Sequence, residues 1–330
     1  MKSRSTSEPA ILRNMLPRLK LERIRESAAH IDPVFLNSRQ FTSPALNRRL
    51  GAGLMLKDET RNPVKSFKGR GAEFFASQHT DGRRVICASA GNFGQGMAYA
   101  CVRRGIPVTV YAGVNASPIK LERMRGLGAE VILHGADFDA AKLEARRVAA
   151  TSAARFVEDS RDLETVEGAG TIGLELMNHP ADLDALLIPL GNGAMFNGIA
   201  CACKALRPHI RMIAVQARGA PAMIESWRAG TIISHDRIAT IADGIGVREP
   251  VPEAVADMTD LADDGILVSE QGIRDGMRLL HEHAGLVAEP SSAVGVAAIL
   301  ESGDRFTGQR VGTIICGGNI SPDQLKEWLA

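Results

Sequence analysis

Short apolar segments recur along the chain and are separated by longer amphipathic ones. The amphipathic pattern is clearest at residues 117–128 and 141–150, where apolar positions recur with helical spacing. The apolar runs show no polar alternation, which is typical of parallel strands covered by helices on both faces. A strand–helix–strand order at this spacing predicts parallel βαβ units. The eight runs that we interpret as strands are 53–57, 84–89, 108–113, 130–135, 155–159, 185–190, 211–217 and 311–316.

The chain length and the last helix complete this picture. Ser321 and Pro322 are the expected N-cap and first residue of a final helix. The chain has 330 residues, which suggests about two domains at roughly 150 residues each. There is no internal repeat and no low-complexity linker. We therefore expect two closely docked α/β domains with a cleft between them.

Composition and charge exclude several classes of partner. The formal net charge is +1 and aromatic residues make up 4% of the chain, so we expect no nucleic-acid partner. The apolar stretch 185–203 contains glycines, asparagines and a proline, and we interpret it as a strand, a turn and a buried helix rather than a membrane span. The N-terminus has no apolar core typical of a secretory signal. Five cysteines without a CxxC pair indicate reduced thiols in the cytoplasm.

Three glycine-rich turns follow predicted strands. They lie at residues 89–92, 191–198 and 317–319. In α/β folds ligands bind where strands end and helices begin, and helix N-termini offer free N–H groups to anions. One such turn is explained by chain geometry alone, but three together indicate a ligand that carries a phosphate.

A lysine segment suggests which ligand this is. The dinucleotide and P-loop fingerprints are absent, as are the HExxH and GxSxG motifs. In the segment 56–75, Lys68 follows Phe67 and precedes a Gly-Arg-Gly run, an unusual setting for a lysine on a charged surface helix. A lysine in a dry cleft is the nucleophile of Schiff-base chemistry. A phosphate-bearing aldehyde cofactor requires both this lysine and a glycine-rich anion cup.

Six ordered motifs resemble those of fold-type II pyridoxal-phosphate (PLP) enzymes, the threonine/serine dehydratase family. They are SFKGRGA, SAGNFGQG, LGNGAMFNG, IADGIGV, AEPSSA and CGGN. The resemblance implies an α/β fold like the tryptophan synthase β chain, with two doubly wound parallel-sheet domains and the cofactor in the cleft between them. It implies a large PLP-binding domain (residues 1–75 and 163–330), a smaller inserted domain (residues 76–162) and a homodimer.

The resemblance also assigns roles to individual residues. Lys68 is implied to form the Schiff base with the cofactor, Asn92 to bind its phenolic oxygen and Cys316 to face its ring nitrogen. Gly244 is expected to pack near the cofactor. The backbone N–H groups implied to hold the phosphate belong to Gly191, Asn192, Gly193, Ala194 and Met195. The residues implied to bind the substrate are Ser89, Ala90, Gly91, Asn92 and Phe93.

Three positions depart from the family pattern. Phe93 replaces the usual histidine, which changes the substrate pocket. Gln216 stands where metal-dependent members carry a glutamate ligand, so we expect no divalent metal. Ala90 stands where related serine racemases have a proton-transferring serine, so we expect an enzyme that eliminates but racemises poorly.

The expected activity is a β-elimination on a serine- or threonine-like amino acid, giving a 2-oxo acid and ammonia. Lys68 would act as the general base. One alternative is a replacement reaction like that of threonine synthase, which the segment LKDETRNPVKSFKGR resembles. Its phosphorylated substrate would need a second cationic cup, for which Lys65 and Arg70 are candidates unless both are simply solvated. Another alternative is an amino-acid sensor without catalysis.

Overall fold

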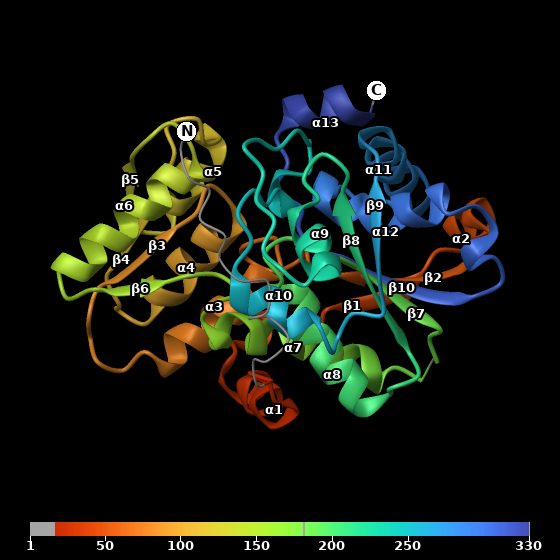
Figure 1. Cartoon of the computed structure of the whole chain (residues 1–330), viewed down its shortest axis with the longest axis horizontal. Coiled ribbons are helices and arrows are strands. Elements are labelled where there is room, and N and C mark those ends of the chain that lie inside the picture. The colour runs from red at the N-terminus through yellow and green to blue at the C-terminus, as the bar shows by residue number, and fades with distance from the viewer. Residues whose placement is uncertain (1–16, 181, 330) are drawn as a thin grey trace, which may run out of the picture.

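Two β-sheets organise the computed structural model, which describes residues 17–180 and 182–329 (Figure 1). The larger sheet has the order β1-β2-β10-β7-β8-β9, and the smaller has the order β5-β4-β3-β6. The strands of the larger sheet are β1 (Arg39–Thr42), β2 (Gly53–Asp58), β7 (Ala185–Pro189), β8 (Arg211–Ala217), β9 (Asp264–Val268) and β10 (Arg310–Ile315). The strands of the smaller sheet are β3 (Val85–Ala88), β4 (Val108–Ala112), β5 (Glu130–Leu133) and β6 (Arg155–Val157).

All eight predicted strand segments are strands, and they pair in parallel. The sequence interpretation missed β1 and β9. Strand β1 pairs antiparallel with β2 at the sheet edge, and its Arg-Gln-Phe-Thr sequence contains a single apolar residue. Strand β9 forms the opposite edge and is only partly buried. Edge strands need no long apolar run. The run in β9 is only Ile266 to Val268, so the pattern of doubly covered strands detects neither edge strand.

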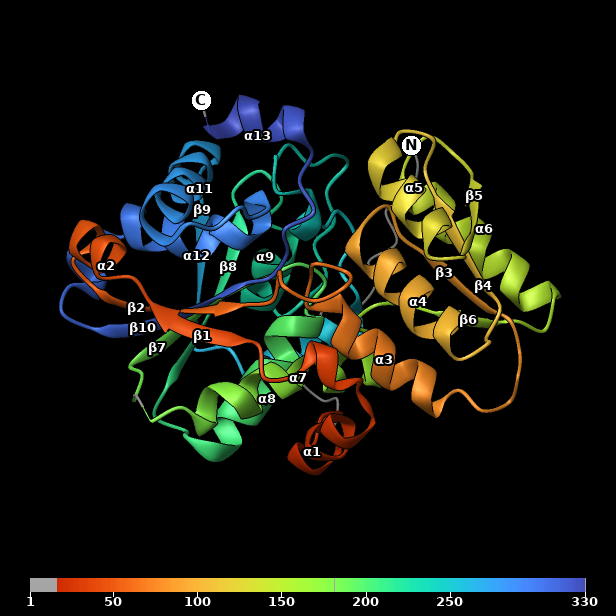
Figure 2. The same ribbon diagram turned by 180° about the vertical axis from the view of Figure 1, so that it is seen from behind.

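Helices cover both faces of the larger sheet. Helices α11 and α12 pack on one face, and α7 and α8 pack on the other (Figures 1 and 2). The helices are α1 (Leu21–His30), α2 (Pro44–Leu50), α3 (Lys68–Gln78), α4 (Asn92–Arg103), α5 (Pro118–Gly126), α6 (Phe138–Thr151), α7 (Leu163–Asn178), α8 (Ala194–Leu206), α9 (Ala222–Ala229), α10 (Pro252–Met258), α11 (Glu270–Ala284), α12 (Pro290–Glu301) and α13 (Pro322–Leu329). The described residues also form short 3₁₀ helices at Pro33–Phe35, Asp243–Ile245 and Gly303–Phe306.

The helix predictions agree with this arrangement. The amphipathic stretches 117–128 and 141–150 fall on α5 and α6. The hydroxyl of Ser321 accepts a hydrogen bond from the Gln324 amide at 3.1 Å, so the predicted N-cap is confirmed. The apolar stretch 185–203 is β7, a turn and α8. In the part of the chain that the structure describes, no helix is long and apolar enough to cross a membrane.

Close contact between α3 and α7 fixes the start of α3. A Cβ atom on Gly71 would lie 2.4 Å from the Thr165 carbonyl oxygen, and one on Gly168 would lie 2.6 Å from the Arg70 carbonyl oxygen. Only glycine allows two helix backbones to approach this closely. Figure 2 shows α3 between the two sheets, and Lys68 is the first residue of this helix.

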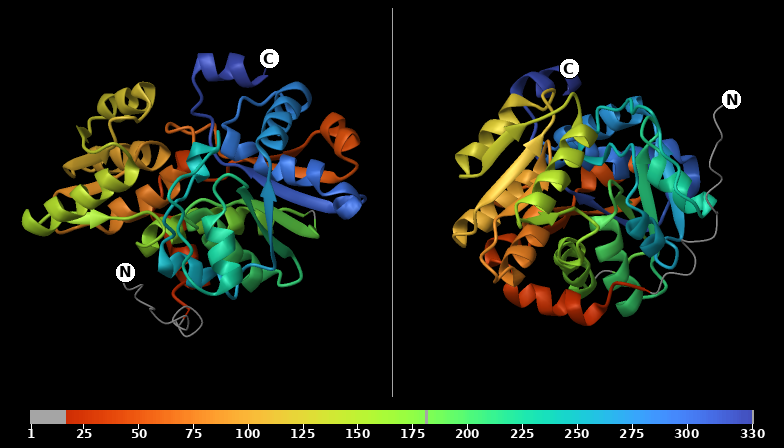
Figure 3. Two further views of the ribbon diagram at one scale, coloured as in Figure 1. Left: turned by 45° about the horizontal axis from the view of Figure 1, so that its top comes forward. Right: turned by 60° about the vertical axis from the view of Figure 1, so that its left-hand side comes forward.

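The order of the smaller sheet creates a crevice beside β3. The chain runs from β3 through β4 to β5 on one side, and β6 then pairs with the other side of β3. Ligands of open α/β sheets bind at such a switch point, outside the carboxyl ends of the strands. Figure 3 shows the small-sheet lobe beside the large-sheet lobe, with the segment between α9 and α10 running between them.

Candidate active site

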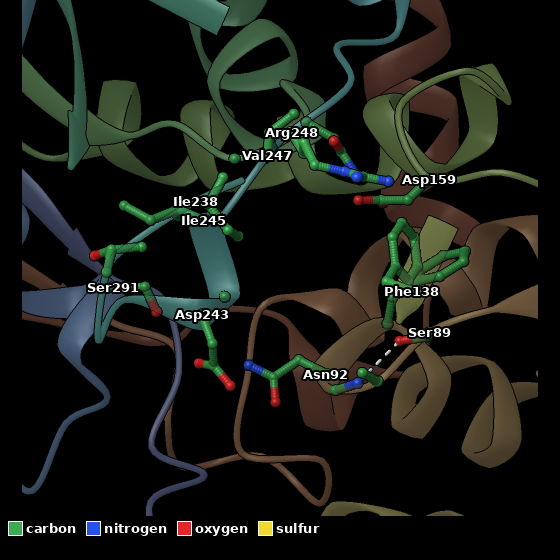
Figure 4. Close-up of a pocket in the computed structure, with 18 of the residues that line it drawn as sticks. Ser89, Asn92, Phe138, Asp159, Ile238, Asp243, Ile245, Val247, Arg248 and Ser291 are labelled. Carbon is green, nitrogen blue, oxygen red and sulfur yellow. Dashed lines mark hydrogen bonds between the residues drawn. The ribbon is translucent and has the colours of Figure 1, made fainter. Parts of the chain in front are cut away.

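A cavity of about 560 Å³ lies between the two sheets, within the range of small-molecule pockets. The turns after β3, β6, β7 and β10 line it together with the segment 236–249. Asn92 and Asp243 lie at one end of the cavity, and Arg248 and Asp159 lie at another (Figure 4). Every residue assigned to the site from the sequence lines this cavity: Lys68, Ser89, Ala90, Gly91, Asn92, Phe93, Gly191, Asn192, Gly193, Ala194, Met195, Gly244 and Cys316.

Lys68 is held at the cavity wall by the loop that precedes it. The Asn62 side chain donates hydrogen bonds to the Glu59 and Ser66 carbonyl oxygens at 2.9 and 3.0 Å, which folds this loop back on itself. The Phe67 amide donates to the Cys316 carbonyl oxygen at 3.0 Å, which ties the loop to the end of β10. Lys68 therefore enters the cavity from a fixed point beside Cys316.

The turn after β7 forms an open anion cup. Gly193 has φ of 102°, which favours glycine, and a Cβ atom there would lie 3.1 Å from the Asn197 side-chain nitrogen. Helix α8 begins at Ala194, and no side chain caps its N-terminus. Its first N–H groups and the helix dipole therefore face the cavity, where they favour an anion such as a phosphate.

The turn after β3 is partly capped by its own serine. The Ser89 hydroxyl oxygen accepts hydrogen bonds from the Gly91 and Gly94 amides at 3.1 and 2.9 Å. This leaves its hydroxyl hydrogen able to donate to a ligand. The arrangement suits a substrate carboxylate at the start of α4, although the Gly91 amide, expected from the sequence to bind it, donates to Ser89.

Asn92 lies in a buried hydrogen-bond network. Its side-chain nitrogen donates to both carboxylate oxygens of Glu289, at 3.0 and 3.1 Å, and its oxygen accepts from the Asn319 side chain at 2.8 Å. Burial raises the pKa of Glu289, as does the negative charge of Asp243, while Lys120 opposes this rise. The network fixes which end of the Asn92 amide donates. A contact from Asn92 to the cofactor requires one of its N–H groups to turn away from Glu289.

Cys316 is a neutral group at the end of β10. Its thiol lies 3.4 Å from the Ser292 hydroxyl. Burial raises the pKa of the Cys316 thiol to about 11. The side chain therefore offers a weak, uncharged hydrogen-bond partner rather than a thiolate nucleophile.

The sequence interpretation missed several charged residues of the site. Asp159 contacts Lys68, with 2.5 Å between its carboxylate oxygen and the lysine nitrogen. Lys120 pairs with Asp243 across the cavity at 2.5 Å. Burial lowers the pKa of Lys120, but Asp243 and Glu289 outweigh this effect and raise it. Asp159 is the last residue of the predicted strand 155–159. A search of that strand end for charged residues would therefore have identified it as a site residue.

The second cationic cup considered for a phosphorylated substrate is not found. Arg70 is fully buried and pairs with Glu59 at 2.8 Å and with Glu175 at 2.6 Å. It is therefore neither a ligand for substrate phosphate nor a solvated charge. Lys65 is exposed and lies outside the cavity lining. Both expectations for Arg70 were wrong, because the packing of α3 buries it and brings Glu175, which lies 105 residues away in the sequence, into contact with it.

Gln216, the residue at the position of a metal-ligating glutamate, is engaged elsewhere. Its side-chain oxygen accepts a hydrogen bond from the Ile224 amide at 3.1 Å. Within residues 17–180 and 182–329 no three His, Cys, Asp or Glu side chains are grouped so as to hold a metal ion.

The fold and the cavity define a class of enzyme in which a lysine and an anion cup meet between two α/β domains. The model of the family "Pyridoxal-phosphate dependent enzyme" matches residues 32–317, and the chain belongs to this family. The predicted family, fold-type II architecture and PLP cofactor are thereby confirmed.

Individual relatives agree with this assignment. The chain is 36% identical to an L-threonine ammonia-lyase of Thermotoga maritima, over 93% of this chain and 77% of that protein. It is 33% identical to the biosynthetic L-threonine dehydratase IlvA of Escherichia coli, over 84% of this chain but only 55% of that protein. The solved structure of maize serine racemase matches with a TM-score of 0.87 and 29% identity, covering 93% of this chain and 96% of that one.

The residues of the cavity fit PLP. Lys68 is within the cavity to take the aldehyde, and the uncapped start of α8 offers N–H groups for the phosphate. Cys316 offers a neutral contact for the ring nitrogen. The cavity therefore contains a matching group for the aldehyde, the phosphate and the ring nitrogen of the cofactor.

Proposed function

We propose that the protein is a PLP-dependent lyase that removes the β-hydroxyl and α-amino groups of a serine- or threonine-like amino acid. The products are a 2-oxo acid and ammonia. The observation that carries this proposal is the position of Lys68 in the same cavity as the uncapped N-terminus of α8. The names of the Thermotoga and Escherichia relatives support it, and the predicted class, a PLP-dependent lyase, is confirmed.

Each part of the cavity has one task in this reaction. We propose that the N–H groups of residues 191–195 hold the cofactor phosphate, with Asn92, Gly244 and Cys316 around the ring. When bound, PLP supplies a sink for the electrons left at the substrate Cα atom. Ser89 and the start of α4 bind the substrate carboxylate.

Lys68 takes the Cα proton from the substrate. Its side-chain nitrogen, once free, accepts the Cα proton as general base. The β-hydroxyl leaves with the electron pair of the C–O bond and takes up a proton to become water. Hydrolysis of the released enamine then gives the 2-oxo acid and ammonia.

One assay separates this proposal from its alternatives. L-serine and L-threonine should release ammonia and a 2-oxo acid in equal amounts, whereas O-phosphohomoserine should release no phosphate. Phosphate release would favour the replacement reaction, which the burial of Arg70 argues against. The absence of turnover with every amino acid, despite a spectral response of the bound cofactor, would favour a sensor.

Racemisation is the second outcome that the assay must follow, because one solved relative is a serine racemase. Ala90 lines the cavity, and its methyl group cannot transfer a proton. We therefore expect L-serine to give 2-oxo acid much faster than D-serine, with the serine enantiomers resolved by chiral chromatography. D-serine formed as fast as the 2-oxo acid would contradict this expectation.

We further propose the cytoplasm as location, a homodimer as assembly, and the boundaries 1–75 with 163–330 and 76–162 for the two domains. The strands of the smaller sheet all lie between residues 85 and 157, although position 75 falls within α3. Sedimentation analysis of the intact chain tests the dimer. Limited proteolysis between the lobes tests the boundaries.

A further inference from the structure

Asp159 holds the nitrogen that the proposed reaction protonates. Its carboxylate oxygen lies 2.5 Å from the Lys68 nitrogen, which is also 4.6 Å from the centre of the Phe67 ring and 5.8 Å from that of Phe93. The ring faces attract an ammonium group, and the carboxylate in addition accepts a directed, charge-assisted hydrogen bond from it. Asp159 is therefore the group that fixes where the Lys68 nitrogen points.

The pair of Lys68 and Asp159 is largely withdrawn from water, with side chains 15% and 12% exposed. Among the described residues, Lys68 is the only one whose side chain hydrogen-bonds to Asp159. The guanidinium group of Arg248 extends toward Asp159 (Figure 4), but it pairs with Asp139 at 2.5 Å. The charge of Asp159 adds to burial in raising the pKa of the Cys87 thiol, so this thiol stays neutral. The charge of Asp159 therefore acts mainly on Lys68.

The proposed elimination leaves Lys68 with one proton and the β-hydroxyl in need of one. The Cα proton passes to the Lys68 nitrogen, and the hydroxyl leaves with the electron pair of the C–O bond. Hydroxide is a poor leaving group, so a proton donor lowers the barrier to this step. When the Lys68 ammonium group gives the same proton to the leaving oxygen, water departs and Lys68 returns to the neutral amine. No proton then has to enter the cavity from outside.

Other groups on the cavity wall are poorer proton donors. Among the described residues that line the cavity none is a histidine, and Phe93 stands where the family usually has one. Burial lowers the pKa of Lys120, but Asp243 and Glu289 outweigh this effect and raise it. Burial raises the pKa of the Cys316 thiol to about 11. A raised pKa makes a group a weaker acid, so neither Lys120 nor Cys316 is suited to protonate the hydroxyl.

We propose that Asp159 is a positioning residue that keeps the ammonium form of Lys68 beside the substrate, so that Lys68 delivers the Cα proton to the leaving hydroxyl. The inference rests on the proposed elimination and specifies the source of the proton that releases water. The same contact has a consequence for the resting enzyme. When the Lys68 nitrogen is bonded to the cofactor, the neighbouring carboxylate favours the protonated form of that nitrogen.

Two substrates that differ only in their leaving group test the delivery of the proton. β-Chloro-L-alanine has chloride in place of the L-serine hydroxyl, and chloride leaves without a proton. Its elimination and hydrolysis consume one water and give pyruvate, ammonia and hydrogen chloride. Asp159→Asn keeps the shape of the side chain but removes its charge. In the PLP-loaded enzyme it should lower kcat for L-serine about 10²-fold, a typical contribution of acid–base catalysis, and kcat for β-chloro-L-alanine less than about fivefold.

Two controls accompany these rates. β-Chloro-L-alanine reports on folding and cofactor loading, because a misfolded or empty variant turns over neither substrate. Asp81→Asn makes the same chemical change in an exposed loop, and it should leave both rates unchanged.

The visible absorption of the bound cofactor gives a readout that does not depend on turnover. Protonation of the Lys68 nitrogen in its bond with the cofactor changes this absorption, so a pH titration of the resting enzyme follows it. The midpoint should fall by about one to two pH units in Asp159→Asn, because a neighbouring opposite charge favours the charged form. Asp81→Asn should keep the wild-type midpoint.

The outcomes separate this inference from the proposed function. If Asp159→Asn slows both substrates equally, Asp159 acts only on removal of the Cα proton, and delivery to the leaving group is overturned. If it slows neither, another donor such as the cofactor phosphate protonates the hydroxyl, which also overturns the inference. An unchanged absorption titration overturns the contact between Asp159 and Lys68 in the loaded enzyme, and the inference with it. Release of 2-oxo acid by the wild type in these cases keeps the elimination intact, whereas no 2-oxo acid from either substrate overturns the proposed function.

Discussion

Lys68 and Arg70 are cations two residues apart at the start of α3, and their surroundings differ sharply. Arg70 is fully buried and has two carboxylate partners, Glu59 and Glu175, as well as the Thr171 hydroxyl at 2.9 Å. Lys68 faces the cavity and has a single carboxylate partner, Asp159. Burial lowers the pKa of Arg70, but its two glutamates outweigh burial and raise it.

The difference shows how to separate structural charges from reactive ones in this fold. The Arg70 network leaves no room for a ligand, and Lys57 joins it by pairing with Glu175. Its charges balance only when every member is present. The pair of Lys68 and Asp159 opens onto a cavity and keeps one carboxylate oxygen without a partner. Such a pair remains open to a ligand in the cavity.

Replacing Lys68 should have the largest effect on activity. It tests most directly whether Lys68 is the reactive cation of the pair and Arg70 the structural one. Lys68→Ala removes both the attachment point of the cofactor and the general base, so turnover should fall by about 10⁴-fold or more. The protein should still fold, because no buried network depends on Lys68. Activity assays and thermal unfolding of the same preparation measure both expectations.

Lys65 is the matched control for Lys68. It is exposed and lies three residues earlier in the same loop, so Lys65→Ala should keep its activity. Borohydride reduction of the loaded enzyme followed by peptide mapping should recover the pyridoxyl group on Lys68. Recovery on Lys65 would refute the assignment.

Replacing Arg70 should have the opposite profile, with its main effect on stability. Arg70→Ala leaves Glu59 buried without its cation and leaves Glu175 with Lys57 alone, which should cost about 3–5 kcal/mol in the free energy of unfolding. Urea unfolding measures this loss. Arg49→Ala, an exposed arginine in the last turn of α2, should change stability by less than about 0.5 kcal/mol. If Arg70→Ala is as stable as the wild type but has low activity, Arg70 acts in the reaction and not in stabilising the fold, which contradicts this prediction.

The parts of the site that the sequence predicted are those encoded locally. The turns after β3, β7 and β10 each combine a strand end with glycines, and all of them line the cavity. The SFKGRGA motif likewise identified Lys68 within one short segment. The buried strands were predicted for the same reason, because an apolar run is visible without knowledge of its neighbours.

The missed parts depend on partners that are distant along the chain. Asp159 lies 91 residues from Lys68, and Glu175 lies 105 residues from Arg70. A charged residue at the end of a strand does not reveal which cation it will meet. Arg70 therefore resembled either a solvated charge or a phosphate ligand, and only the packing of α3 against α7 decides between a buried network and these alternatives.

Cys316 should give the smallest effect, because it lines the cavity without carrying a charge. Its thiol stays neutral well above physiological pH, since burial raises its pKa to about 11. Serine offers a similar neutral contact, so Cys316→Ser should keep kcat/KM within about tenfold, equivalent to about 1.4 kcal/mol. The pH–rate profiles of the two enzymes should coincide between pH 6 and pH 9, because neither side chain ionises there. A loss of several orders of magnitude, or a new ionisation in the profile, would show that the thiol takes part in the chemistry and that an uncharged residue of this cavity can be as reactive as Lys68.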